Sequence, residues 1–154
     1  MERPEVMRAM QTSISEVLET MFFLPVRFYE GVGLEVLGDI TDLVISRVTF
    51  GGPFQGRMMI FIPRDLARSI TASFLGKDEA GVSHEHLEET VKEIDNMIAG
   101  NTFTVLDEKS VFNLGIPQLV DYNDVKNELD PEQGIVVPIN TPDGALVVWM
   151  NIDS

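Results

Sequence analysis

The chain has 154 residues, of which 44% are hydrophobic and 23% charged, as expected for one globular domain with a sizeable core. Its 25 acidic and 11 basic residues give a net charge of −14, which argues against binding to the phosphate backbone of a nucleic acid. This charge favours partners that present positive groups, or it simply keeps the protein in solution.

The sequence lacks two features, cysteine and a long apolar run, and this excludes further kinds of site and protein. There is no cysteine, which excludes disulfides and thiolate metal sites, and no apolar run approaches the roughly 20 residues of a membrane-spanning helix. The first residues, MERPEVMRAMQTS, mix acidic and basic side chains without an apolar stretch, so we expect no secretory signal. We therefore expect a cytoplasmic protein that binds neither membrane nor nucleic acid.

The first half of the chain predicts a helix, several strands and a second helix. A three-four rhythm of apolar residues predicts a helix over 3–23, ended by Pro25, with the stripe Met7, Met10, Ile14, Val17, Leu18 and Met21. Strands are predicted at 26–29, 33–37, 42–50 and 56–63. Residues 64–75 are predicted to be helical and to end at Gly76, with a stripe of Leu66, Ile70 and Phe74.

The second half is predicted to begin with the longest helix, over 83–106, with Ser83 as its N-cap. Residues 110–120 are predicted to be extended, with Pro117 at a sheet edge or bend. Residues 121–132 are predicted to form a solvated acidic connection, and 134–140 with 145–152 a hairpin. This order predicts an α+β fold in which long helices pack on a mainly antiparallel sheet.

The sequence also indicates an internal repeat. EVLETM at 16–21 aligns with EIDNM at 93–97 at an offset of 77 residues. Gln55-Gly56 and the strand after it align with Gln133-Gly134 at an offset of 78. We therefore predict one domain, 1–154, with pseudo-twofold halves of about 1–77 and 78–154, each a helix followed by strands.

The helix over 83–106 has two different faces. Steps of four, three and four residues place an apolar stripe on one face: Leu87, Val91, Ile94 and Ile98. The same steps place a polar set on the opposite face: Glu89, Glu93, Asn96 and Gly100. Asparagine is unfavourable inside a helix because its side chain competes for backbone hydrogen bonds. Asn96, one turn after Glu93, therefore indicates a function, and in the repeat Glu19 stands where the second half has Asn96.

The string EIDNMIAGN at 93–101, with Pro117 downstream, resembles the CheC/CheX/FliY family of bacterial chemotaxis phosphatases. The duplicated plan resembles that family too, so the resemblance covers most of the chain. A single Glu-x-x-Asn pair is more similar to CheX than to CheC. Two features depart from the family pattern: Glu89 stands where the family has Asp or Ser, and Pro117 lies slightly closer than usual.

The resemblance implies an enzyme that hydrolyses the aspartyl phosphate of a CheY-type response regulator. In that reaction Asn96 would orient the attacking water and Glu93 would pair with a lysine of the regulator. The regulator itself supplies Mg²⁺, so no cofactor or metal of the chain's own is expected. Gly100 would allow a partner's backbone to approach closely. Glu89 and Pro117 are weaker candidates for partner contact, the alternatives being a surface charge and a structural proline.

Other interpretations stay open. Relatives with this fold occur in the flagellar switch, so the alternative function is a non-catalytic docking or assembly module. Asn101 is expected to make a buried hydrogen bond rather than to contact the substrate. His84 and His86, near two glutamates, could be read as metal ligands, but they do not share a helical face. The β-branched strands are compatible with a CheX-like homodimer, and the sequence leaves open whether a CheD-like activator binds.

Overall fold

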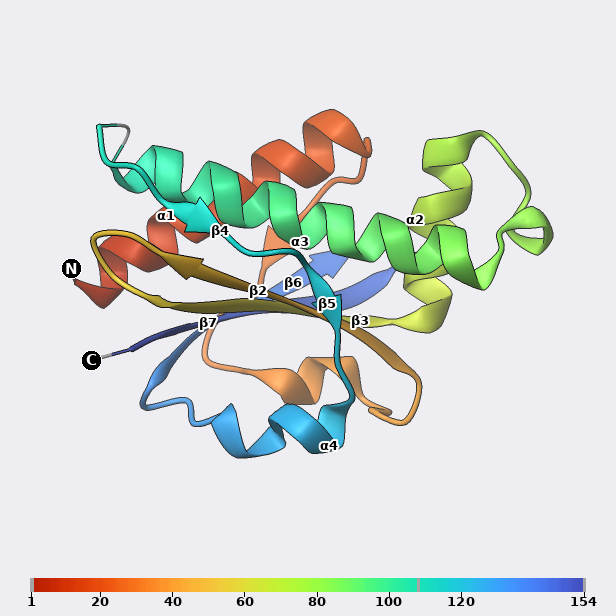
Figure 1. The fold of residues 1–154 in the computed structure, drawn as a ribbon. Coiled ribbons are helices and arrows are strands. Elements are labelled where there is room, and N and C mark those ends of the chain that lie inside the picture. The colour runs from red at the N-terminus through yellow and green to blue at the C-terminus, as the bar shows by residue number, and fades with distance from the viewer. Residues whose placement is uncertain (1, 108, 154) are drawn as a thin grey trace.

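The strands form one antiparallel sheet in the order β1-β6-β7-β3-β2-β4, with β5 also paired to β2 (Figure 1). This computed structural model describes residues 2–107 and 109–153. The strands are β1 Arg27–Phe28, β2 Leu43–Gly51, β3 Gly56–Pro63, β4 Asn113–Leu114, β5 Gln118–Leu119, β6 Gly134–Thr141 and β7 Gly144–Ile152. The helices are α1 Arg3–Ser15, α2 Arg64–Leu75, α3 His84–Leu106 and α4 Tyr122–Val125.

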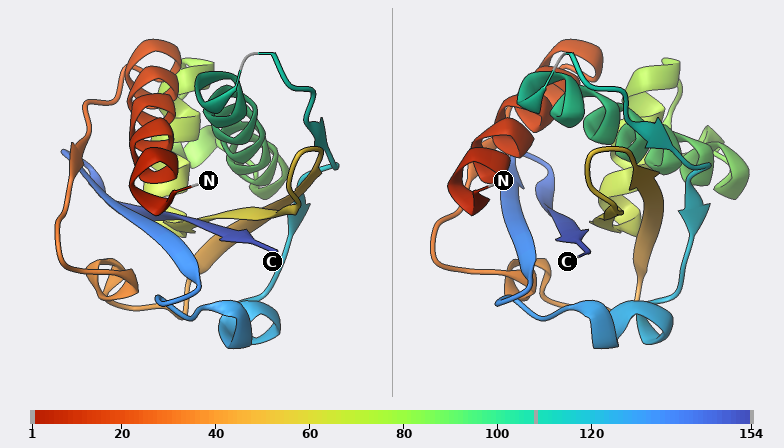
Figure 2. Two further views of the ribbon diagram at one scale, coloured as in Figure 1. Left: turned by 90° about the vertical axis from the view of Figure 1, so that its left-hand side faces the viewer. Right: turned by 60° about the vertical axis from the view of Figure 1, so that its left-hand side comes forward.

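The three longer helices cover one face of the sheet, and α4 lies against the other (Figure 1). Figure 2 shows α1 and α3 side by side across the sheet. The predicted α+β fold with a mainly antiparallel sheet is confirmed. Each half of the chain contributes one long helix and one hairpin, but the internal duplication itself stays a prediction. Within the described residues, no helix combines the length and the apolar character that crossing a membrane requires.

Alternation along the strands divides the apolar side chains between two cores. On β2, Val44 and Val48 pack under the helices, whereas Ile45 points to the opposite face and packs with Trp149. The central strand β3 is buried on both faces, which explains its continuous apolar sequence. Both sheet faces are therefore covered, and α3 rests on the larger core.

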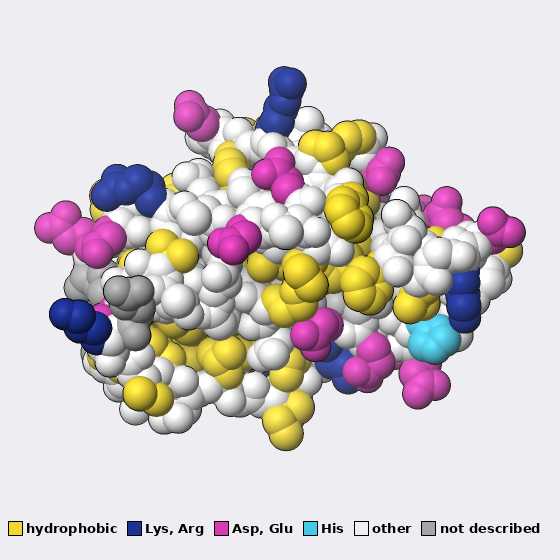
Figure 3. Space-filling view, turned by 90° about the horizontal axis from the view of Figure 1, so that it is seen from above, with side chains coloured by type: hydrophobic (Ala, Val, Ile, Leu, Met, Phe, Trp, Pro, Cys, Tyr) yellow, Lys and Arg dark blue, Asp and Glu magenta, His cyan; other side chains and the backbone are white. Residues whose placement is uncertain are grey.

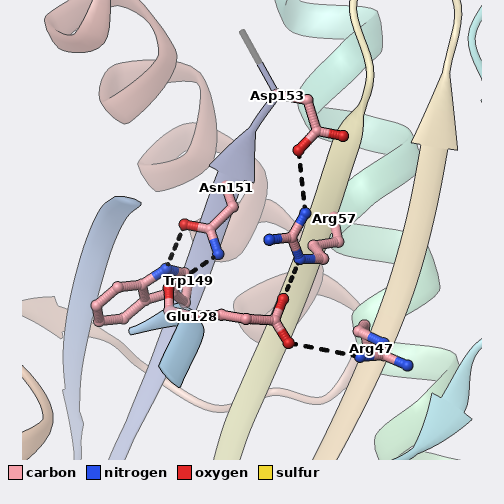
Figure 4. A network of polar contacts seen from close by, with 6 residues as sticks. All are labelled: Arg47, Arg57, Glu128, Trp149, Asn151 and Asp153. Atoms are coloured by element: carbon pink, nitrogen blue, oxygen red, sulfur yellow. Dashed lines mark hydrogen bonds and ion pairs between the residues drawn. The ribbon is translucent and has the colours of Figure 1, made fainter. Parts of the chain in front are cut away.

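A polar network holds the segment that follows α4 against the sheet face opposite the long helices, which we call the far face (Figure 4). Glu128 pairs with Arg57 of β3 and, at 3.7 Å, with Arg47 of β2. Asn151 joins the same segment, because its amide donates to the Glu128 carbonyl at 3.2 Å and its oxygen accepts from the Trp149 indole at 2.9 Å. This network lies on the face opposite α3.

One sequence prediction of local structure was wrong, and another was incomplete. Residues 33–37 do not form a strand but contain a 3₁₀ turn, Leu34–Leu37, which packs Leu37 into the far-face core. Residues 121–132 are mostly exposed, as predicted for a solvated connection, but they also contain α4 and a 3₁₀ turn, Lys126–Glu128, which the sequence prediction lacked. Val125 is fully buried there and Glu128 holds the arginine pairs, so this acidic segment is anchored to the sheet.

The helix that begins with α1 continues beyond Ser15 as a π-helix, which has a wider turn than an α-helix. Residues Glu16–Met21 (η1) are π-helical, and the Leu24 amide closes the segment on the Leu18 carbonyl at 2.9 Å. Phe23 follows with a φ of +54°, and it is the only described non-glycine residue with positive φ. The chain thus leaves the helix through a strained residue before Pro25.

Candidate functional site

Helix α3 is fixed in rotation about its own axis. Its first turn is capped, because the Ser83 hydroxyl accepts from the His86 amide at 3.1 Å. The predicted apolar stripe is fully buried: Leu87, Val91, Ile94 and Ile98. The buried Ser13 hydroxyl of α1 donates to the Ile98 carbonyl at 2.8 Å. With one face locked in this way, the opposite face of α3 can point only outward.

Glu93 and Asn96 both lie on that outer face. Glu93 is exposed and Asn96 half-buried, and they are one turn apart, about 4.5 Å along the helix axis. The side-chain bonds of α3 are made by other residues, and among the described residues neither Glu93 nor Asn96 has a hydrogen-bond or ion-pair partner. A carboxylate and a carboxamide are therefore presented together to an approaching molecule.

The weaker candidates occupy more ordinary surroundings. Glu89 is paired with Lys92 at 2.9 Å, a surface pair three residues apart. Gly100 lies against the protein's own β4, since a Cβ there would be 3.6 Å from Leu114 Cδ1. Pro117 lies between β4 and β5 at the sheet edge, which confirms its predicted place. Contact of these three residues with a partner stays a prediction.

Asn101 links the two long helices. Its amide donates to Glu16 of η1 at 3.1 Å, which confirms the expected internal hydrogen bond, although the residue is half-buried rather than buried. Glu19 accepts from the Val26 amide at 3.2 Å. The residues that align with Glu93 and Asn96 in the first half, Glu16 and Glu19, are thus both used in internal hydrogen bonds.

A groove borders α3 on the side of Glu93. It has a volume of about 280 Å³ and is lined by Phe22, Phe74, Leu75, His86, Glu89, Thr90 and Glu93. Figure 3 shows hydrophobic side chains gathered between acidic ones on this helical face. Phe74 does not join the buried stripe predicted for α2: its ring meets Phe22, with centroids 4.9 Å apart, and 53% of the residue is exposed. Phe74 in the last turn of α2 thus packs on Phe22, which follows η1, and not into the core, which is why periodicity misplaced it.

Sequence reasoning also missed Asp95, which lies between Glu93 and Asn96 but on the buried side of α3. Its carboxyl is fully buried, and neither its oxygens nor the Ser46 hydroxyl has a hydrogen-bond partner among the described residues. Burial raises the pKa of Asp95 well above its ordinary value, and the nearby Ser46 hydroxyl offsets this only in part. The sequence gives one sign of this burial: Asp95 lies 200° around the helix from Glu93, and therefore on nearly the opposite side.

No metal centre accompanies this site in the described part of the chain, where no group of three His, Asp or Glu side chains is arranged to hold an ion. His84 instead lies with its Nδ1 atom 3.5 Å from the guanidinium of Arg64. The outer face of α3 presents a carboxylate, a carboxamide and the groove beside them.

A family described as "Chemotaxis phosphatase CheX" matches residues 44–140, more than half of the chain and a range that contains Glu93 and Asn96. The chain belongs to the CheX family. The predicted family is thus confirmed, and it is a family of chemotaxis phosphatases. No curated protein sequence matches the chain.

Solved structures show the same fold. The chemotaxis protein CheX from Vibrio vulnificus is 20% identical with a TM-score of 0.75, and the match covers 99% of both chains. CheX from Borrelia burgdorferi, crystallised with CheY, BeF₃ and Mg²⁺, is 22% identical with a TM-score of 0.71, covering 96% of this chain and 97% of that one. FliY from Thermotoga maritima is 15% identical with a TM-score of 0.63, covering 93% and 84%.

Proposed function

We propose that this CheX-family protein hydrolyses the aspartyl phosphate of a CheY-type response regulator. The observation that carries the proposal is the pair Glu93 and Asn96, which point outward from a rotationally fixed helix without partners of their own among the described residues. A relative in the same family has been crystallised with CheY, BeF₃ and Mg²⁺. BeF₃ mimics a phosphoryl group, so that complex supports a phosphorylated regulator as the substrate here.

In the proposed reaction Asn96 orients the water. Its carboxamide oxygen accepts from the water and its NH₂ group can donate to a phosphoryl oxygen, which holds the water in line with the bond that breaks. The water oxygen forms a bond to phosphorus, the bond from phosphorus to the aspartyl oxygen breaks, and the regulator recovers its carboxylate. The proton lost by the water leaves with phosphate or solvent, so neither Asn96 nor Glu93 acts as a general base.

Glu93 has a positioning role in this proposal. As an exposed carboxylate one turn before Asn96, it can pair with a lysine of the regulator and fix how the two proteins dock. Mg²⁺ belongs to the regulator and neutralises phosphoryl charge there. The described residues of this chain form no site that would replace that ion.

The test compares phosphate release from a phosphorylated CheY-type regulator in the presence of the wild-type protein and of Asn96→Ala. We expect the wild type to accelerate release and Asn96→Ala to lose most of that acceleration while remaining folded. A wild-type protein that binds the phosphorylated regulator stably without turnover would instead support the docking-module alternative.

A further inference from the structure

The groove next to Glu93 has one apolar wall. The groove that Glu93 helps to line has Phe22, Phe74 and Leu75 as its other wall. Phe74 is 53% exposed and Leu75 39%, and both lie at the end of α2. Met21 and Phe23, the chain neighbours of Phe22, are 47% and 84% exposed. We call Met21, Phe23, Phe74 and Leu75 the aromatic patch. Clusters of exposed apolar side chains of this kind mark interaction sites.

Phe23 is presented at a conformational cost. Its φ of +54° is unfavourable for a bulky side chain, and such strain persists only where the surrounding structure enforces it. Two hydrogen bonds that span Phe23 do so: the Leu24 amide donates to the Leu18 carbonyl at 2.9 Å, and the Val26 amide donates to the Glu19 carboxylate at 3.2 Å. The backbone is therefore held in a strained form that leaves a phenylalanine ring in solvent.

The α2 part of the patch, Phe74 and Leu75, is continuous with the proposed catalytic face, because these two residues line one groove with Glu93. Glu93 lines the groove, and Asn96 lies about 60° around the helix from it, toward β4 and β5. A protein that brings a cationic group to Glu93 is therefore placed next to the groove and can cover it. Glu89 and Glu93 form the acidic rim of this apolar surface, which fits a partner with an apolar surface next to a positive group.

A second copy of the chain fits this surface less well. A twofold contact through the patch would bring the acidic rims of both copies into one interface, and no described Lys or Arg lines the groove to pair with them. The net charge of −14 adds to the repulsion between two copies. The charge pattern thus favours a different protein as the occupant.

We propose that the aromatic patch is the apolar half of the docking surface for the phosphorylated response regulator, with Phe23 and Phe74 as its anchors. This inference rests on the proposed function, and it assigns binding of the regulator and hydrolysis of its phosphoryl group to different residues. The patch governs how tightly the regulator binds, whereas Asn96 governs how fast the bound phosphoryl group is hydrolysed. Aromatic anchors of this kind dominate the binding energy of many interfaces.

The test uses Phe23→Asn and Phe74→Gln in the full chain, with a purified CheY-type receiver domain as the partner. Asparagine tolerates a positive φ, so Phe23→Asn removes the ring without adding backbone strain. Val32→Asn is the matched control, because Val32 is also an exposed apolar residue but lines a different cavity with Trp149 of the far-face core. Binding is measured with the receiver loaded with BeF₃ and Mg²⁺. Turnover is measured as phosphate release from the phosphorylated receiver.

We expect Phe23→Asn and Phe74→Gln each to raise Kd and KM about tenfold or more, with kcat reduced less than about threefold. Val32→Asn should match the wild type. Unchanged Kd and KM in both patch variants would overturn the docking inference while leaving the proposed function intact if the wild type still hydrolyses the substrate. A wild type that binds through the patch without hydrolysis would contradict only the proposed function. Sedimentation showing a wild-type dimer that Phe23→Asn dissociates would assign the patch to a second copy and overturn the inference.

Discussion

At the scale of single residues, the outer face of α3 separates two tasks between neighbours one turn apart. Asn96 is neutral and half-buried, as suits a group that must hold a water in one place. Glu93 is exposed and charged, as suits a group that meets a partner's cation. Substitutions at the two positions should therefore have different kinetic signatures.

Glu93→Gln keeps the shape of the side chain and removes its charge. If Glu93 pairs with a lysine of the regulator, we expect KM to rise about tenfold and to depend less on salt, with kcat close to that of the wild type. Initial rates at several regulator and salt concentrations measure this. Glu85→Gln, in the exposed first turn of the same helix, is the control and should change neither quantity. An unaltered KM and salt dependence in Glu93→Gln would contradict the docking role.

Asp95 predicts a dependence of stability on pH. Its folded-state pKa is raised by burial, so above the unfolded-state pKa, near 3.8, the folded protein holds a proton that the unfolded chain has released. The free energy of unfolding should then fall with rising pH, by about 1.4 kcal/mol per pH unit, until the folded-state pKa is reached. Asp95→Asn cannot ionise and should lack this decline, so its stability relative to that of the wild type should increase as the pH rises.

Urea unfolding of wild type and Asp95→Asn between pH 4 and pH 8 measures the effect. Asp121→Asn, a change of the same kind at an exposed position, should follow the wild type. A stability difference between wild type and Asp95→Asn that stays constant with pH would show that the carboxyl does not titrate as its burial requires.

At the scale of elements, the spacing of apolar residues correctly predicted the helices that bury a single stripe of apolar side chains. The buried stripe of α3 and the capping Ser83 could be predicted because residues within one helix determine both. The turn at Leu34–Leu37 and α4 were missed, since their form depends on packing against the far face of the sheet. The groove was missed for a related reason: Phe22 follows η1 and Phe74 lies in α2, and the sequence does not indicate that they meet.

The sheet offers a stability test at the same scale. A Cβ on Gly134 of β6 would lie 2.3 Å from Trp149 Nε1 on β7, closer than real atoms approach. Gly134→Ala must push the buried indole aside, and we expect it to lower the free energy of unfolding by about 1–3 kcal/mol. Gly81→Ala is the control, because no atom lies within 4 Å of its Cβ position. Equal urea midpoints for the two variants would contradict the close packing of Gly134 on Trp149.

At the scale of the whole molecule, the two faces of the sheet carry different features. One face of the sheet is closed by α4 and the Arg47–Arg57–Glu128 network, and the other carries the helices with Glu93, Asn96 and the aromatic patch. The family and the fold class could be predicted from the motif and the element order, whereas the patch depends on exposures that only the assembled structure shows. Pairing of two copies through a sheet edge stays a prediction, which light scattering at micromolar concentration can check.

The central claim is that Asn96 acts on the bound phosphoryl group. The direct measurement is single-turnover dephosphorylation of a CheY-type regulator at saturating concentrations of wild type, Asn96→Ala and the control Asn123→Ala, which alters an exposed asparagine on α4. Saturation removes differences in binding from the comparison. We expect Asn96→Ala to slow phosphate loss by about a hundredfold or more, with Asn123→Ala as fast as the wild type. Equal rates for Asn96→Ala and the wild type would contradict the claim.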